Sequence, residues 1–316
     1  MTGAAAASGG EEEDVVADER LLVVGAGTMG SQIAQKAALC GVAVDLVDVS
    51  AEQLQRAADQ NRRLLEGRVA RGRMEAGDAE AALARVAYGE DLAAAASRGD
   101  WAIEAVLERI DVKRQTFAEL DRHLPAHAGM ATNSSNIVSS RLADATRRPE
   151  LCCNMHFFHP VLVMDLCEVV RGPHTAEDTA RRAVAWSRRM GRAPVLIEKE
   201  IDGFVVNRIL GAASREAFTL LTAGVATPAD IDTAARLGLG WRLGPFQLAD
   251  FSGLDTVHDV RRDRFEKSGA PGDRVTVELL AQLLAEGRRG RKSGRGFYDY
   301  STDPPSPLPV PGLDEG

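Results

Sequence analysis

Two histidines and a glutamate carry the clearest chemical signal, in the stretch NMHFFHPVLVMDLCEVV near the middle of the chain. An imidazole has an unperturbed pKa near neutral pH, so His156 could accept a proton from a substrate group. A carboxylate beside the ring selects its tautomer and stabilises the imidazolium, and Glu168 could supply it if strand geometry returns it to His156. The pattern therefore indicates an acid–base pair, and its alternative is a buried strand with incidental polar residues.

The same stretch could also bind a metal, because His156 and His159 are three residues apart. A zinc site needs a third protein ligand in fixed geometry, and no obvious third ligand accompanies the two histidines. The four cysteines have neither the spacing of a zinc site nor that of a disulfide framework. We therefore expect no metal, and we expect reduced cysteines in a cytoplasmic protein.

A glycine-rich turn follows the apolar run LLVV near the start of the chain, and an amphipathic pattern typical of a helix follows the turn. Gly25, Gly27 and Gly30 spell G-x-G-x-x-G, with Thr28 and Met29 between the last two. In a dinucleotide-binding turn, the first glycine permits the tight bend, the second admits the pyrophosphate, and the third lets the helix pack closely. The helix N-terminus then stabilises the anion, so all five residues are predicted to contact a cofactor.

An acidic residue ends the second predicted strand, VAVDLVDV, at Asp48. A carboxylate in this place accepts hydrogen bonds from an adenosine ribose and repels a 2′-phosphate. No basic residue follows directly, since Val49, Ser50 and Ala51 come next. The sequence therefore favours NAD over NADP, and the alternative is a glycine-rich turn in some other α/β protein.

Strand-like and helix-like segments alternate as far as VLIEK, at residues 195–199, which predicts an α/β fold with a Rossmann-type, doubly wound and mostly parallel sheet. After IDGFVVNR the pattern becomes helical, and Thr227 and Pro228 are typical of a helix N-terminus. The expected domains are an acidic disordered tail (1–18), an NAD-binding domain (19–200), a helical C-terminal domain (201–300) and a proline-rich tail (301–316).

Composition excludes several other classes of protein. The net charge of −8 argues against nucleic acid as a partner. No apolar run approaches the roughly 20 residues of a membrane helix.

Residues 51–85 are expected to be helical and include an arginine-rich stretch: Arg62, Arg63, Arg68, Arg71 and Arg73. Such a stretch is either a solvated face or a patch for an anionic ligand such as the phosphates of coenzyme A.

From about residue 20 to residue 300, the chain resembles the L-3-hydroxyacyl-CoA dehydrogenase family. The resemblance rests on motifs in family order: GAGTMG, EAVLERIDVKRQTFAELD, TNSSN, MHFFHP, VMDLCEVV, DGFVVNRIL, LGPFQLADFSGLDT and GRKSGRGFYDY. It implies a two-domain enzyme, a homodimer through its helical domains, that reversibly oxidises an L-3-hydroxyacyl-CoA to the 3-ketoacyl-CoA with NAD.

The resemblance also implies roles for individual residues. His156 matches the catalytic base and Glu168 its orienting carboxylate. Ser135 and Asn207 match groups that contact the reacting oxygen of the substrate and hold the nicotinamide region. Four residues match cofactor contacts: Asp48, Glu108, Lys113 and Lys292. Arg71 falls where the family often has a basic residue near coenzyme A.

Three residues depart from the family pattern. His159 replaces the asparagine of H-F-F-N-P, Asp165 stands where a lysine is common, and Leu64 replaces an expected polar contact to coenzyme A. Asp165 adds a negative charge near the expected pocket. These departures keep two alternatives open. One is a related dehydrogenase of a small hydroxy acid without coenzyme A, carnitine-like or a sugar acid, and the other is a non-catalytic dinucleotide-binding protein.

Overall fold

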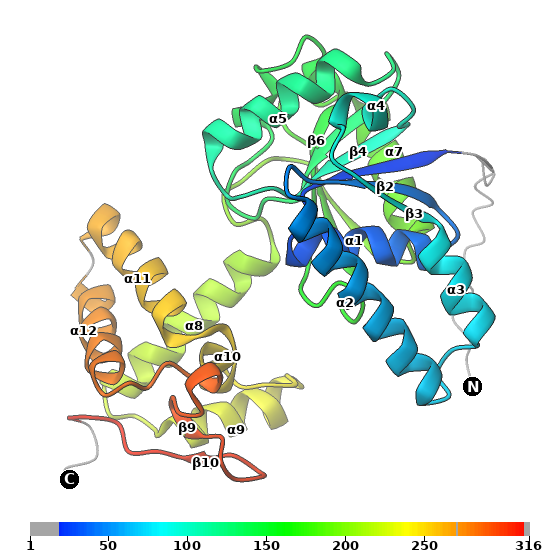
Figure 1. Ribbon diagram of the computed structural model, residues 1–316. Coiled ribbons are helices and arrows are strands. Elements are labelled where there is room, and N and C mark those ends of the chain that lie inside the picture. Colours follow the sequence, from blue (N-terminus) through cyan, green and yellow to red (C-terminus); the bar gives the residue numbers. More distant parts are fainter. Residues whose placement is uncertain (1–18, 270, 313–316) are drawn as a thin grey trace, which may run out of the picture. The chain divides into compact units, whose positions relative to one another are not determined.

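The computed structural model describes residues 19–269 and 271–312, and the chain divides into two compact units between Val205 and Val206 (Figure 1). The expected acidic tail, residues 1–18, lies outside the described residues, as do residues 313–316 of the expected proline-rich tail. The domain boundary had been expected near residue 200.

A single sheet organises the first unit. In the described part of this unit it has eight strands, in the order β3-β2-β1-β4-β5-β6-β7-β8. The strands are β1 (Arg20–Val24), β2 (Ala43–Val47), β3 (Val86–Gly89), β4 (Trp101–Glu104), β5 (Gly129–Thr132), β6 (Cys152–Phe157), β7 (Leu166–Val170) and β8 (Ala193–Ile197). All neighbours pair in parallel except β6 and β7, which are antiparallel. The prediction of a doubly wound, mostly parallel sheet is confirmed.

Helices cover both faces of this sheet: α1 (Thr28–Leu39), α2 (Ala51–Ala70), α3 (Ala76–Ala84), α4 (Leu92–Ala96), α5 (Ile110–His123), α6 (Ser140–Ala143) and α7 (Glu177–Arg189). Side chains alternate along a strand, so Leu21 packs into the core under α1 and α7, whereas Leu22 packs into the core under α4 and α5. Burial on both faces explains why LLVV is apolar at every position.

Two expectations about single segments need correction. Residues 51–85 are not one helix, because α2 ends at Ala70 and Gly72 adopts a φ of 63° in the turn before α3. The stretch 154–170 is not one strand. It folds back on itself as β6 and β7, with a turn between them.

The second unit is helical, as predicted. Its helices are α8 (Val206–Thr222), α9 (Pro228–Leu239), α10 (Pro245–Ser252), α11 (Leu254–Ser268) and α12 (Pro271–Ala285), followed by the short strands β9 (Tyr298–Asp299) and β10 (Ser306–Pro307). Thr227 caps α9 as expected, since its Oγ1 accepts a hydrogen bond of 3.2 Å from the Asp230 N–H. Phe218, Phe246 and Phe297 form the centre of the core.

The described part of the expected proline-rich tail, residues 301–312, packs on this helical unit. Val310 is buried in its core, and Arg288 Nη1 donates a hydrogen bond of 2.8 Å to the Pro309 carbonyl. Leu308 N donates a hydrogen bond of 2.9 Å to the Phe297 carbonyl. These contacts join the chain end to the helices that precede it.

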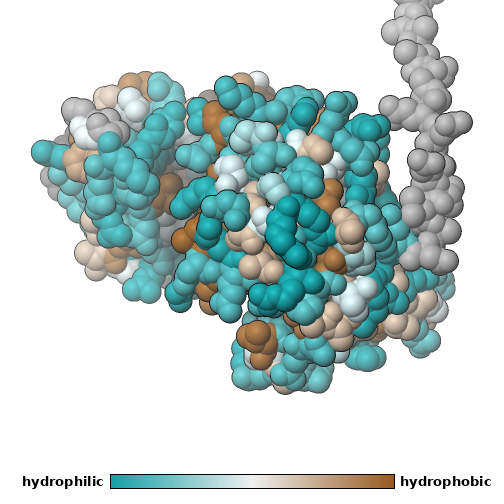
Figure 2. All heavy atoms as spheres, turned by 90° about the horizontal axis from the view of Figure 1, so that it is seen from above, coloured by the Kyte–Doolittle hydropathy of each residue, from teal (hydrophilic) through white to brown (hydrophobic). Residues whose placement is uncertain are grey.

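Hydrophilic residues cover most of the face in Figure 2, with apolar residues in small scattered groups. Such scattering is ordinary for a protein surface. Among the helices of the described residues, none is both long enough and apolar enough to cross a membrane.

Candidate active site

The glycine turn joins β1 to α1, and two of its glycines are required by close packing. Gly25 has a φ of 103°, and a Cβ there would lie 2.6 Å from the Ala105 carbonyl oxygen. A Cβ on Gly30 would lie 1.8 Å from the Gly25 carbonyl oxygen. At Gly27, by contrast, a Cβ would meet no atom within 4 Å. The open space at Gly27 is where the expected pyrophosphate would approach the N-terminus of α1, which begins with Thr28 and Met29.

Asp48 follows β2 and turns back toward the glycine turn. Its Oδ2 accepts a hydrogen bond of 2.7 Å from Ala26 N, and its Oδ1 accepts one of 3.0 Å from Ser50 N. These backbone donors fix the carboxylate beside the turn. The arrangement fits a carboxylate that accepts hydrogen bonds from a ribose.

The antiparallel pairing of β6 with β7 places His156 directly opposite Glu168. Opposite residues of an antiparallel pair project from the same face, and His156 Nδ1 lies 2.8 Å from Glu168 Oε2. Both side chains are buried, at 6% and 0% exposure. An ionised carboxylate only accepts hydrogen bonds, so Nδ1 carries the proton and Nε2 is left to take one from a ligand. The expected closeness of these two residues is confirmed.

Two residues that the sequence did not indicate complete the surroundings of this pair. Val205 N donates a hydrogen bond of 3.0 Å to Glu168 Oε1, so both carboxylate oxygens are held. Phe204 is fully buried, its ring centroid lies 5.5 Å from that of His156, and its φ is 49°. A left-handed conformation in a bulky residue is costly and has no sequence signature, although the neighbouring DG pair indicates a turn.

The polar turn after β5 holds two serines with different surroundings. The Ser134 hydroxyl hydrogen-bonds the Glu108 carboxylate and accepts a hydrogen bond of 2.8 Å from Ile137 N. Asn154 braces the same turn, because its Oδ1 accepts a hydrogen bond of 2.7 Å from Ser139 N. Among the described residues, the partly exposed Ser135 hydroxyl has no hydrogen-bond partner. The fold therefore uses Ser134 to shape the turn and leaves Ser135 available to a ligand.

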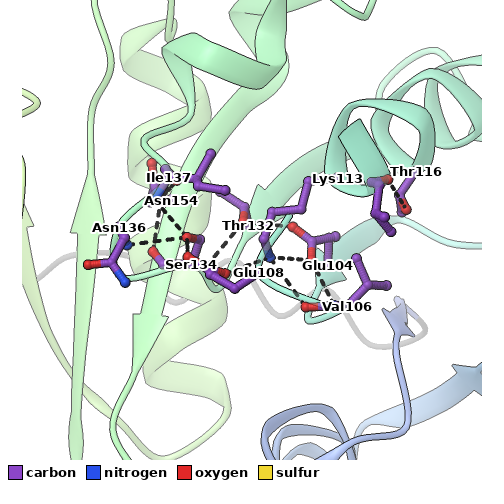
Figure 3. A network of polar contacts seen from close by, with 11 residues as sticks. Glu104, Val106, Glu108, Lys113, Thr116, Thr132, Ser134, Asn136, Ile137 and Asn154 are labelled. Atoms are coloured by element: carbon purple, nitrogen blue, oxygen red, sulfur yellow. Dashed lines mark hydrogen bonds and ion pairs between the residues drawn. The ribbon is translucent and has the colours of Figure 1, made fainter. Parts of the chain in front are cut away.

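Glu108 and Lys113 belong to a polar network beside this turn (Figure 3). Lys113 Nζ lies 2.7 Å from Glu104 Oε1, 3.1 Å from Glu108 Oε2 and 3.4 Å from the Val106 carbonyl oxygen. The sequence did not indicate Glu104, because nothing local pairs it with a lysine nine residues later.

The loop between β6 and β7 carries His159, which is exposed, and it is fixed at two points. Val161 N donates a hydrogen bond of 2.8 Å to Gln32 Oε1 on α1, and Arg192 Nη1 donates one of 3.0 Å to the Val161 carbonyl. The negative charge of Asp165 is partly balanced here, since its Oδ1 lies 3.5 Å from Arg192 Nη1. Neither Gln32 nor Arg192 stood out in the sequence.

The remaining candidates belong to other elements. Arg71 is exposed in the turn after α2, and Leu64 is exposed on α2. Asn207 lies in α8 and Lys292 in a short 3₁₀ helix, both in the helical unit, where Lys292 Nζ lies 2.6 Å from Asp255 Oδ1. Over the described residues, no three His, Cys, Asp or Glu side chains are grouped so that they could hold a metal ion.

Comparison with known proteins identifies the family of both units. The profile of the 3-hydroxyacyl-CoA dehydrogenase NAD-binding domain matches residues 20–201, and that of the 3-hydroxyacyl-CoA dehydrogenase C-terminal domain matches residues 203–300. Together the two matches cover nearly all of the described chain.

Individual relatives agree with these matches. A probable 3-hydroxybutyryl-CoA dehydrogenase of Bacillus subtilis is 36% identical over 89% of this chain and 97% of its own. The solved (S)-3-hydroxybutyryl-CoA dehydrogenase of Ralstonia eutropha is 35% identical, with a TM-score of 0.81 over 90% of this chain and 100% of its own. A solved diketoreductase is 32% identical, with a TM-score of 0.80 over 90% of this chain and 99% of its own. The chain belongs to the 3-hydroxyacyl-CoA dehydrogenase family.

Proposed function

We propose that this protein is an NAD-dependent dehydrogenase that reversibly oxidises an L-3-hydroxyacyl-CoA to the 3-ketoacyl-CoA. The observation that carries the proposal is the buried pair of His156 and Glu168, 2.8 Å apart near the carboxyl end of β6. In a doubly wound sheet, ligands bind beyond the carboxyl ends of the strands, where the strand order reverses. Here that place is between β1 and β4, next to the glycine turn.

Each member of the pair has a separate part in the proposed reaction. NAD, when bound, supplies the hydride acceptor. His156 Nε2 takes the proton of the C3 hydroxyl, and Glu168 stabilises the imidazolium that forms. The Ser135 hydroxyl donates a hydrogen bond to the reacting oxygen, and Asn207 is proposed to contact the same region of the substrate.

The cofactor site is proposed to consist of the glycine turn and the groups around it. The pyrophosphate binds at the glycine turn and the start of α1, at Gly25, Gly27, Thr28, Met29 and Gly30. The Asp48 carboxylate accepts hydrogen bonds from the adenosine ribose. Glu108, Ser135 and Lys292 are proposed as further contacts. Lys113 Nζ already has three partners inside the protein, so a direct contact of Lys113 with the cofactor would have to displace one of them.

A substrate panel tests the proposal. L-3-hydroxyacyl-CoAs of several chain lengths and free hydroxy acids are each offered with NAD and with NADP, and formation of the reduced cofactor is followed by absorbance. We expect turnover with a coenzyme A thioester and NAD. Faster turnover of a free acid would contradict the substrate class. Tight NAD binding with no turnover anywhere on the panel would identify a binding protein instead.

A dehydrogenase of a substrate without coenzyme A is the second candidate. The likeness to the solved diketoreductase supports it, together with the exposed His159 in the loop between the proposed base and its carboxylate. The imidazole of His159 is bulkier than the amide of an asparagine and has different hydrogen-bonding atoms. A His159→Asn variant that gains activity toward coenzyme A thioesters would favour this second candidate.

A homodimer formed through the helical unit is part of the proposal. Its support is the family resemblance and a set of apolar side chains of this unit that are more than half exposed: Ile209, Val225, Leu237, Leu239 and Val260. Sedimentation equilibrium of the full chain tests it, and a monomer at micromolar concentration would contradict it.

The cytoplasmic setting expected from the cysteines stays part of the proposal, and all four cysteines are free.

A further inference from the structure

Glu104 ends strand β4 with a carboxylate that the proposed mechanism does not use. It is fully buried, and it accepts hydrogen bonds of 2.7 Å each from Lys113 Nζ, Thr132 Oγ1 and Val106 N (Figure 3). A buried charge is costly, and burial raises the pKa of the Glu104 carboxyl. Three well-placed donors at such a position indicate that the carboxylate has a definite task.

The partner of Glu104 is equally buried. Lys113 lies in the first turn of α5 with 1% of its side chain exposed. An ammonium group has three N–H bonds, and their acceptors are Glu104 Oε1, Glu108 Oε2 and the Val106 carbonyl oxygen. Lys113 thus joins the buried Glu104 to Glu108, whose side chain is 44% exposed.

Glu104, Lys113 and Glu108 together anchor one loop, residues 105–109, which lies against the glycine turn. The Ala105 carbonyl oxygen is the atom that a Cβ on Gly25 would strike, and Ala105 N donates a hydrogen bond of 2.8 Å to the Val24 carbonyl. The loop follows β4, the strand across the reversal of strand order from β1. It therefore forms one wall of the crevice where a dinucleotide binds in such sheets.

We propose that Glu104 is a positioning residue for the cofactor site: through the Lys113 ammonium, it holds the 105–109 loop and the Glu108 carboxylate in place beside the glycine turn. This inference rests on the proposed function, because it places NAD in that crevice. Without the Glu104 charge, the Lys113 ammonium has Glu108 as its one remaining anionic partner and draws that carboxylate inward. An amide at position 104 also keeps only one acceptor oxygen, so Val106 N and Thr132 Oγ1, which donate to different oxygens of the carboxylate, no longer both have an acceptor, and the loop is held less firmly.

The Glu104→Gln variant tests the proposal, because it keeps the size of the side chain and removes its charge. Its Kd for NADH, measured by fluorescence titration of the full chain, is expected to rise about tenfold, the loss of a charged hydrogen bond. The KM for NAD is expected to rise in parallel, while kcat at saturating NAD changes less than about threefold, since uniform binding alone is lost.

Asp121→Asn is the matched control. Asp121 is a second buried carboxylate, on α5, and it is paired at 2.8 Å with Arg147 and with Arg148. It lies about 12 Å beyond Lys113 along the helix axis. Its loss should lower the Tm and leave the Kd for NADH unchanged. If Glu104→Gln behaves in the same way, Glu104 is only structural and the proposal is overturned.

A double-variant cycle tests the route through Lys113. If Glu104 acts through Lys113, then Glu104→Gln/Lys113→Met should weaken NADH binding no more than Lys113→Met does alone. If the losses of NADH affinity in the two single variants add up in the double variant, Glu104 does not act through Lys113. The double variant removes both buried charges together, so it decides the question even if Glu104→Gln does not fold. Wild-type affinity in the double variant overturns the inference and leaves the proposed function intact, whereas a wild-type chain that binds no NADH overturns both.

Discussion

At the scale of single residues, the proposed chemistry depends on which atoms the fold has already used. Glu168 occupies Nδ1 of His156, so only Nε2 can exchange a proton with a ligand. Val205 N holds the other carboxylate oxygen, which keeps Glu168 from rotating away from the ring. Burial also strengthens the interaction between the carboxylate and an imidazolium, because little water screens it.

Two substitutions test the roles proposed for this pair. His156→Ala is expected to lower kcat by about 10² to 10⁴, the usual contribution of a general base, with the Kd for NADH unchanged. Glu168→Gln keeps the shape but can turn an N–H toward Nδ1, which reverses the tautomer, so kcat should fall by a factor of the same order. Turnover is measured with the best substrate of the panel. Near wild-type turnover in His156→Ala would refute the assignment of the base.

At the scale of elements, the antiparallel pair of β6 and β7 places His156 and Glu168 next to each other. A shift of one residue in its register would turn Glu168 to the other face of the sheet, away from His156. The loop at its tip is fixed by Arg192, whose guanidinium donates to the carbonyls of Val161, Met164 and Met190. The guanidinium is almost fully buried, so these carbonyls have few other partners.

Removing this anchor should therefore cost both stability and activity. Arg192→Met leaves three carbonyl groups without their donor and is expected to lower the free energy of unfolding by about 2–3 kcal/mol. The loss is measured by urea denaturation, and kcat should fall because the loop joins the two strands that carry His156 and Glu168. The control is Arg181→Met on α7, whose ion pair with Asp178 is exposed at the surface, and it should change stability by less than about 0.5 kcal/mol. Equal effects of the two variants would contradict the anchoring role.

At the scale of the whole molecule, the chain folds as two units with separate cores, and a buried carboxylate organises the second. Asp250 of α10 accepts hydrogen bonds from Phe297 N at 2.9 Å, Tyr298 N at 3.0 Å and the Tyr300 hydroxyl at 3.1 Å. It thereby fastens the segment after α12 to the helices. Burial raises the pKa of Asp250 from 3.8 to about 6.

The stability of the helical unit should consequently depend on pH through Asp250. The folded pKa lies above the unfolded one, so this stabilisation is fully present below about pH 4 and is lost as the pH rises through about 6. The free energy of unfolding of the wild type, relative to that of Asp250→Asn, should fall by about 3 kcal/mol between about pH 4 and pH 6. The Asn side chain of the variant does not titrate. Hydrogen exchange of the Phe297 and Tyr298 amides in both proteins measures the difference. A difference that does not change with pH would show that Asp250 keeps an ordinary pKa when folded.

Much of this protein was determined by local sequence alone. The strand, glycine turn, helix and terminal acid around Gly25 and Asp48 are set by short-range sterics and periodicity, so the α/β fold and the glycine turn between its first strand and helix could be predicted. The change to a helical pattern after IDGFVVNR predicted the second unit in the same way. Residue types indicated His156 and Glu168 as an acid–base pair, and the family motifs added Ser135 as a candidate.

Only the tertiary structure decided which of these residues meet. Residue types suggested that Glu168 could pair with His156, but the strand register that brings it there depends on packing across the whole sheet. The pairing of Glu104 with Lys113, the left-handed Phe204 and the Arg192 anchor involve contacts between distant segments or backbone angles that have no local signature. Such contacts form because the folded core excludes water and buried polar groups must find partners within it, which is a property of the assembled chain and not of any segment.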